Sequence, residues 1–238
     1  MSQSRKTAIV VGTLFIVGDI AGVLSVVITC GLLDGHESLM KIAANQDRLV
    51  AGTLCILAMG FALALVPVVM YPVFRRFNQV LAMGYVVFRG ALETVTYLAT
   101  ATTWLLLLAL SQDYLKAGSP AAPQFGTLGG LLLKAQGSIA TEMTAIVFCL
   151  GALMFAYLFY QSRLIPRWLS IWGLAGAGLY LVVPILSLFG YSAGILMAPL
   201  AVQEVVLAVW LIARGFDSRA LQASPASASI SIAGASAS

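Results

Sequence analysis

The sequence predicts an all-α membrane protein, a polytopic transmembrane helical bundle with six spans. Of its 238 residues, 61% are hydrophobic and only 9% are charged, whereas soluble domains carry about 25% charged residues. The apolar runs are roughly 20 to 30 residues long, which suits membrane helices, because the strands of a membrane barrel need only about 10 residues. Lipid offers the backbone no hydrogen bonds, so helices are the expected spanning elements.

The apolar runs define the expected organisation of the chain. The polar segments 34–48 and 111–127 are expected to be loops, the first with a short helix from Ser38. Pro67 and Pro72 predict a kink or an early end in the second run. One membrane domain is expected over residues 1–222, followed by a disordered tail, residues 223–238, rich in Ser and Ala. The predicted spans are about 7–33, 49–74, 80–110, 128–160, 168–189 and 195–213.

The distribution of Lys and Arg predicts the orientation in the membrane. Six spans put both termini on one side, which then carries eight basic residues against four on the other side. Because cytoplasmic loops are enriched in Lys and Arg, both termini are expected in the cytoplasm. The eight are Arg5, Lys6, Arg75, Arg76, Arg163, Arg167, Arg214 and Arg219, and the four are Lys41, Arg48, Lys116 and Lys134.

The third span is the most informative one, because it carries Arg89 and Glu93 near its middle. Residues four apart on a helix lie on the same face, so these two side chains are expected to form an ion pair. Tyr85 and Tyr97 continue the same stripe at four-residue steps. The span therefore presents a polar seam on an otherwise apolar helix.

Three further acidic side chains are predicted inside the membrane, namely Asp19, Glu142 and Glu204. At about 1.5 Å per residue, all three fall within reach of the layer that holds Arg89. Four carboxylates and one guanidinium would leave a large negative excess in a low dielectric, so at least one carboxyl is expected to be neutral and protonated. Such groups relay protons, bind a cation, or act only as neutral hydrogen-bonding groups between helices.

Several other chemistries lack the residues that they need. The single histidine, His36, falls in an expected loop, so neither a metal site nor a haem held by histidines is expected. The net charge of +4 arises from basic residues at the ends of the apolar runs and does not indicate a nucleic-acid partner. We expect no catalytic residue, metal or cofactor. The expected partners are the lipid bilayer and a small-molecule or ion ligand.

Three features together resemble the uncharacterised bacterial membrane family labelled domain of unknown function 4386. They are the opening Arg5–Lys6 with Gly12, the step from Arg89 to Glu93, and the turn with the sequence LIPRWLSIWG at residues 164–173. The likeness covers nearly the whole chain apart from the Ser- and Ala-rich tail. It implies a multi-span prokaryotic membrane protein and brings no activity or ligand.

The sequence leaves three classes of function open. The first is a small transporter or membrane ligand-binding protein whose buried carboxylates and Arg89 line an internal site. The second is a non-catalytic structural or accessory membrane protein, in which the same groups only fix helix packing. The third, and least favoured, is a lipid-modifying enzyme that uses carboxylates. Neither the ligand nor the oligomeric state follows from the sequence.

Overall fold

The computed structural model describes residues 3–34, 38–117 and 122–222, and within this part of the chain every regular element is a helix. Of the side chains in that range, those of residues 122–123 and 138–140 are not described. The described residues contain six helices that are long and apolar enough to cross a membrane, which confirms the predicted class of fold. These helices cover Gln3–Thr29, Gln46–Phe74, Gln79–Ala117, Gln124–Ser162, Arg167–Leu188 and Gly194–Ala213. The tail expected to be disordered, and His36, lie outside the described residues.

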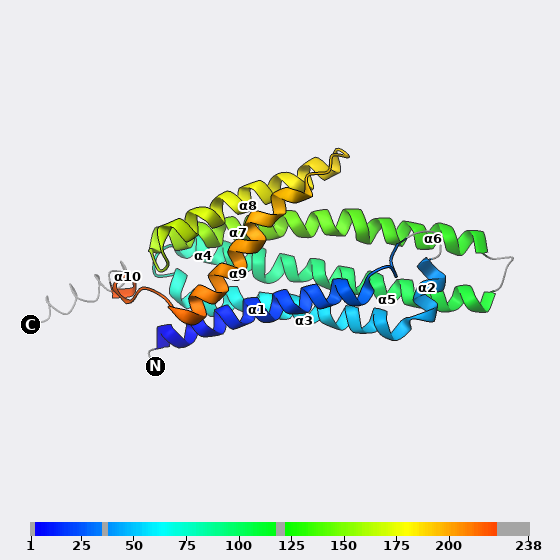
Figure 1. Cartoon of the computed structure of the whole chain (residues 1–238), viewed down its shortest axis with the longest axis horizontal. Coiled ribbons are helices and arrows are strands. Elements are labelled where there is room, and N and C mark those ends of the chain that lie inside the picture. The colour runs from blue at the N-terminus through cyan, green and yellow to red at the C-terminus, as the bar shows by residue number, and fades with distance from the viewer. Residues whose placement is uncertain (1–2, 35–37, 118–121, 223–238) are drawn as a thin grey trace, which may run out of the picture. The chain divides into compact units, whose positions relative to one another are not determined.

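Figure 1 labels most of the helices along the chain. The first, second and fifth spans are the single helices α1 (Gln3–Thr29), α3 (Gln46–Phe74) and α8 (Arg167–Leu188). The third span runs through α4 (Gln79–Tyr85), the π-helix η1 (Val86–Leu92) and α5 (Glu93–Ala117). The fourth runs through α6 (Ala122–Lys134), the π-helix η3 (Ala135–Ala140) and α7 (Thr141–Ser162), and the sixth through η4 (Gly194–Met197) and α9 (Ala198–Ala213). The short helices α2 (Ser38–Ala44) and α10 (Ser218–Gln222) complete the set.

The chain divides into two compact units, which are described separately. The first unit comprises Met1–Ile16, Ala62–Glu93 and Ala145–Ser238, and the second comprises Val17–Phe61 and Thr94–Thr144. The boundaries between them fall inside α1, α3, α5 and α7, so each of these helices contributes to both units.

The core of the first unit is a cluster of aromatic rings. Phe155 of α7 stacks on Tyr85 of α4, with ring centroids 4.8 Å apart, and meets Phe159 edge-on at 4.6 Å. Phe74, at the end of α3, contacts Tyr85, Phe155 and Phe159 edge-on. All four side chains are at most 7% exposed. Such rings bury large apolar areas, and their edge-to-face contacts fix how α3, α4 and α7 pack.

Helices α8 and α9 form a hairpin in the same unit (Figure 1). A Cβ atom added to Gly176 would lie 3.1 Å from the backbone of Leu200, so the two helices approach closely because Gly176 has no side chain. The C-terminal end of α9 is capped by Arg5, whose guanidinium donates to the carbonyls of Leu211 and Ile212 at 3.2 and 2.6 Å. Cations stabilise helix C-termini in this way, so the first residues of α1 hold the end of the last span.

The second unit is built on close contact between α1 and α3. A Cβ atom on Gly22 would lie 2.6 Å from Met59 Sδ, and Ser25 Oγ donates to the Gly52 carbonyl at 2.9 Å. The face of α1 that carries these small and polar residues is therefore a packing face, with Ser25 and Thr29 buried. A separate cluster brings together Leu32, Leu39, Ile42, Leu49, Trp104 and Leu107.

Several helix ends differ from the prediction. Helix α1 ends at Thr29 rather than near residue 33, because Gly31 adopts a left-handed conformation (φ +75°) that terminates the helix. Of the kink or early end predicted at Pro67 and Pro72, the early end does not occur, since α3 continues through both prolines to Phe74, where the span was predicted to end. The ring of Pro67 packs close to Gly90 of η1, so that neighbouring helix accommodates the proline.

The loop predicted at 111–127 is also wrong over most of its length. Helix α5 extends to Ala117 and α6 begins at Ala122. Residues such as Leu115 and Lys116 are good helix formers, so the fall in hydropathy marks a change in polarity and not a helix end. The short helix predicted from Ser38 is confirmed as α2.

Replacing Gly12 with alanine is expected to destabilise the first unit by about 1–3 kcal/mol, because the core there has no room for a methyl group. The new Cβ atom would lie 2.7 Å from the Ala208 carbonyl oxygen and 2.7 Å from Ile212 Cγ1. Thermal unfolding in detergent measures the effect. Gly178→Ala is the matched control, because no atom lies within 4 Å of the added Cβ. Equal unfolding midpoints for the two variants would contradict this account of the α1–α9 contact.

Candidate functional site: a buried arginine between two glutamates

The candidate site begins at the π-helix η1, which carries Arg89 at its centre. The backbone N–H of Glu93 donates to the carbonyl of Phe88, five residues earlier, instead of the four-residue step of an α-helix. π-helical turns are rare and occur frequently at functional sites. Gly90 lies in this turn against the Pro67 ring, so close packing with α3 accompanies the altered geometry.

Arg89 forms ion pairs with two glutamates from different helices. Its Nη1 lies 3.2 Å from Glu93 Oε2, and its Nη2 lies 3.3 Å from Glu204 Oε1 of α9. The side chains of Arg89 and Glu93 are 3% and 1% exposed, while that of Glu204 is 18% exposed. The guanidinium therefore joins the third span to the sixth, and Glu204 is the more accessible of its two acids.

Two aromatic rings also lie next to the Arg89 guanidinium. The centroid of the Phe148 ring lies 4.5 Å from Arg89 Cζ, and that of Phe15 lies 5.9 Å away. A desolvated cation over an aromatic face gains about 2 kcal/mol or more. Gly151 brings α7 against this site, because a Cβ atom there would lie 3.2 Å from Arg89 Cβ. The rings exclude water and strengthen the electrostatic interactions of the ion pairs.

Glu204 also lines a small cavity between α7, α8 and α9. The cavity offers about 10 Å³ of space to the centre of a water molecule, enough for about one water. Ser170 and Gln203 are its other polar lining residues. Gln203 Nε2 donates to the Leu169 carbonyl at 3.3 Å, whereas Ser170 Oγ is buried without a hydrogen-bond partner among the described residues. Glu204 therefore takes part in the ion pair and also lines a water-sized space whose other lining residues are mainly apolar.

The cluster is not neutral when every group is charged. One guanidinium and two carboxylates sum to one negative charge, and arginine keeps its proton in proteins. A proton on one carboxyl, or one monovalent cation, makes the cluster neutral. Among the described residues, no group of three or more His, Cys, Asp or Glu side chains is arranged to hold a metal ion.

The structure brings together some of the predicted site residues. Arg89 and Glu93 form the predicted pair, and of the three further acids it is Glu204 that joins them. Tyr85 is 1% exposed within the aromatic core one turn from Arg89, and its hydroxyl has no hydrogen-bond partner among the described residues. Tyr97, Asp19 and Glu142 belong to the second unit, so their part in this site stays a prediction.

Several residues of the site were not expected from the sequence. Phe148 and Phe15 cover Arg89, and Gly151 admits the close approach of α7. Ser170, which lines the cavity, lies in the turn sequence that carried the family resemblance, but that resemblance did not indicate a cavity. An isolated Phe or Gly in an apolar run carries no such signal, because these residues are common in every membrane helix.

These features define a multi-span helical membrane protein with a charged cluster buried among its helices. The chain belongs to the family described as domain of unknown function (DUF4386), which matches it over residues 10–215. Neither the curated proteins nor the solved structures compared with the chain gave a match.

Arg89→Met is expected to destabilise the protein by about 3–5 kcal/mol, because it leaves two carboxyls buried without their cation. Thermal or denaturant unfolding in detergent measures the loss. The variant that combines Arg89→Met with Glu93→Gln and Glu204→Gln removes every charge and should recover most of the stability. A wild-type midpoint for Arg89→Met alone would show that the ion pairs do not form as described.

Proposed function

We propose that this chain is a small transporter in which Glu204, the ion-pair partner of Arg89, takes up and releases one proton. The observation that supports the proposal best is that Glu204 contacts both Arg89 and the cavity. Its carboxylate pairs with Arg89 at 3.3 Å, and the same side chain lines the water-sized cavity. A carboxyl in that position is able to exchange a proton with water while it remains next to the buried cation.

Protonation of Glu204 changes the contacts of α9. The carboxylate accepts a proton from a hydronium ion: one O–H bond of the hydronium ion breaks and leaves water, an O–H bond to the Glu204 carboxyl forms, and the negative charge that attracts Arg89 Nη2 is lost. Arg89 keeps its ion pair with Glu93. The contact between η1 and α9 is weakened, and α9 is free to favour a second arrangement. A proton bound on one side of the membrane and released on the other is the coupling step of secondary transport.

The turn at η1 supports the same proposal. Intramembrane ionisable residues mark substrate and proton pathways, and transporter sites form where helices are interrupted. Here the interruption is π-helical and carries Arg89 itself. We propose that both termini lie in the cytoplasm, on the charge distribution of the loops. The inner membrane of a prokaryotic cell is the location that the family resemblance implies.

A structural or accessory role is the second candidate, and the burial of the cluster favours it. Glu93 is 1% exposed and Phe148 covers the guanidinium, so the pair also suits a rigid contact between helices. That role requires no flux, no stabilisation by a ligand, and a partner protein that co-purifies with the chain. The transport experiment below separates the two candidates.

Proteoliposomes with an imposed potential and a pH-sensitive dye inside test the transport proposal. The wild-type chain should move protons, alone or with a solute from a broad panel. Glu204→Gln should reduce the flux to that of protein-free liposomes, because an amide carries no exchangeable carboxyl proton. Asp113→Asn is the matched control, since Asp113 is 64% exposed and pairs only loosely with Lys116, at 3.6 Å.

Two results would count against the proposal. Wild-type protein that is folded and correctly inserted, yet shows no flux over the whole panel, would favour the accessory role. Flux that persists in Glu204→Gln would show that this carboxyl does not carry the proton.

A further inference from the structure

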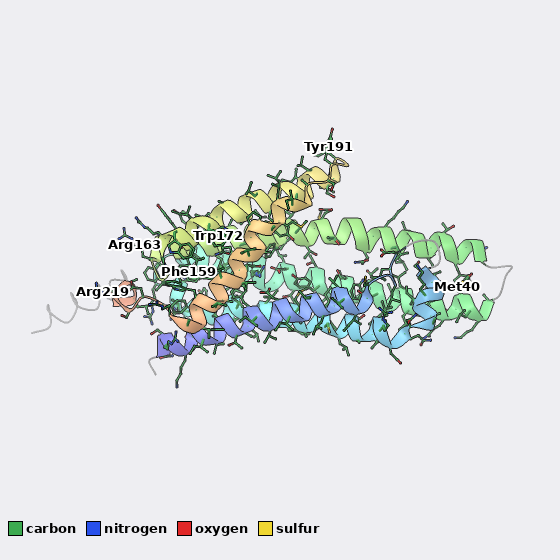
Figure 2. All side chains as sticks on the ribbon, viewed as in Figure 1. Met40, Phe159, Arg163, Trp172, Tyr191 and Arg219 are labelled. Carbon is green, nitrogen blue, oxygen red and sulfur yellow. The ribbon has the colours of Figure 1, made fainter. Side chains whose placement is uncertain are left out.

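A second pocket lies at the end of the first unit, where the turn between α7 and α8 meets the segment that follows α9. It has a volume of about 380 Å³, and Arg163, Arg167, Arg214, Trp210 and Asp217 are among its lining residues. Figure 2 shows Arg163 at this turn. None of these residues belongs to the Arg89 cluster, so the inference does not depend on the proposed transport.

The pocket has a fixed framework. The backbone N–H of Asp217 donates to the Leu164 carbonyl at 2.9 Å, which joins the segment after α9 to the α7–α8 turn. Leu164 and Ile165 are buried beneath it at 0% and 3% exposure. Gly215 turns the chain with a left-handed φ of +74°. The two walls of the pocket are therefore held by backbone geometry and core packing.

Arg163 occupies a backbone position that an arginine rarely takes. Its φ is +55°, in the left-handed region where glycine is favoured. Its backbone N–H donates to the Phe159 carbonyl at the end of α7, so this is the usual place for a glycine that terminates a helix. A strained residue at a helix end suggests that its side chain is needed there.

The charge of the pocket is positive. Arg163, Arg167 and Arg214 are exposed, and none of them forms an ion pair with a carboxylate in the described part of the chain. Asp217 is the acidic residue among those that line the pocket, and its Oδ1 accepts the backbone N–H of Arg219 at 2.8 Å. Three cations and one anion leave an excess of two positive charges, which a phosphate group matches in sign and in hydrogen-bonding geometry.

The surroundings indicate where such a phosphate comes from. The Arg214 guanidinium lies 5.9 Å from the centroid of the Trp210 ring, and Trp168, 52% exposed, contacts Trp210 edge-on at 6.3 Å. Tryptophans at the ends of apolar helices lie at the level of the lipid headgroups. Basic pockets between spans at this level bind anionic headgroups.

We propose that this pocket binds the phosphate headgroup of an anionic phospholipid. The three arginines contact the phosphate, and the Trp168–Trp210 pair lies along the start of the acyl chains. A soluble phosphate shares the headgroup chemistry but cannot use the tryptophans, so the two sources are separable by experiment.

Thermal unfolding of the full-length chain in a neutral detergent tests the proposal. Short-chain phosphatidylglycerol at about ten times its dissociation constant should raise the midpoint by roughly 3–6 °C. Short-chain phosphatidylcholine, which has no net charge, should raise it much less. The variant Arg163→Ala with Arg214→Ala should lose the phosphatidylglycerol shift. The control, Arg75→Ala with Arg76→Ala, removes two exposed charges at the end of α3 and should keep it.

Arg163→Gly separates ligand binding from folding. Glycine suits the left-handed position, so the midpoint without lipid should stay equal or rise, while the phosphatidylglycerol shift should fall. A lower midpoint without lipid would assign Arg163 a structural role and overturn its part in the site. Equal shifts with the two lipids, or an unchanged shift in the Arg163→Ala, Arg214→Ala variant, would overturn the pocket. A full shift with inorganic phosphate alone would overturn the lipid assignment.

Discussion

The sharing of one guanidinium between two glutamates is the interaction on which the rest of this account depends. Arg89 cannot remain buried in an apolar unit without an anionic partner, so Glu93 and Glu204 must reach it from two helices. The requirement brings α9 against η1, and Gly151 and the rings of Phe148 and Phe15 complete the enclosure. The presence of two carboxylates around one cation is the feature on which the proposed proton exchange rests.

Much of this arrangement was predictable from the sequence, for identifiable reasons. Lipid forces the backbone to hydrogen-bond within helices, so six long apolar runs predict six spans. A four-residue separation on one helix predicts the pairing of Arg89 with Glu93. The second acid was left open among Asp19, Glu142 and Glu204, because depth follows from residue counting but the direction in which a helix face points does not. The π-helical turn at Gly90 packs against Pro67 of another helix, and the local sequence does not reveal this contact.

The errors at the helix ends have a related cause. Hydropathy records where a helix changes its surroundings, whereas a helix ends where its backbone is capped or turned. Gly31 turns the chain before the apolar run is complete, and α5 continues through polar residues to Ala117. The difference between hydropathy and backbone geometry also matters at the turn between α7 and α8. Arg163 ends α7 in a conformation suited to glycine, and it was the backbone, not the composition, that singled out the basic pocket.

The central claim is that Glu204 holds the exchangeable proton beside Arg89. Infrared spectroscopy of the purified protein measures this directly, because a protonated carboxyl has its own C=O stretching band, which shifts in D₂O. If Glu204 holds the proton, a carboxyl band titrates with pH and disappears in Glu204→Gln but not in Asp113→Asn. A band that is unchanged in Glu204→Gln, or that is absent from the wild-type protein at every pH at which it is folded, would contradict the account.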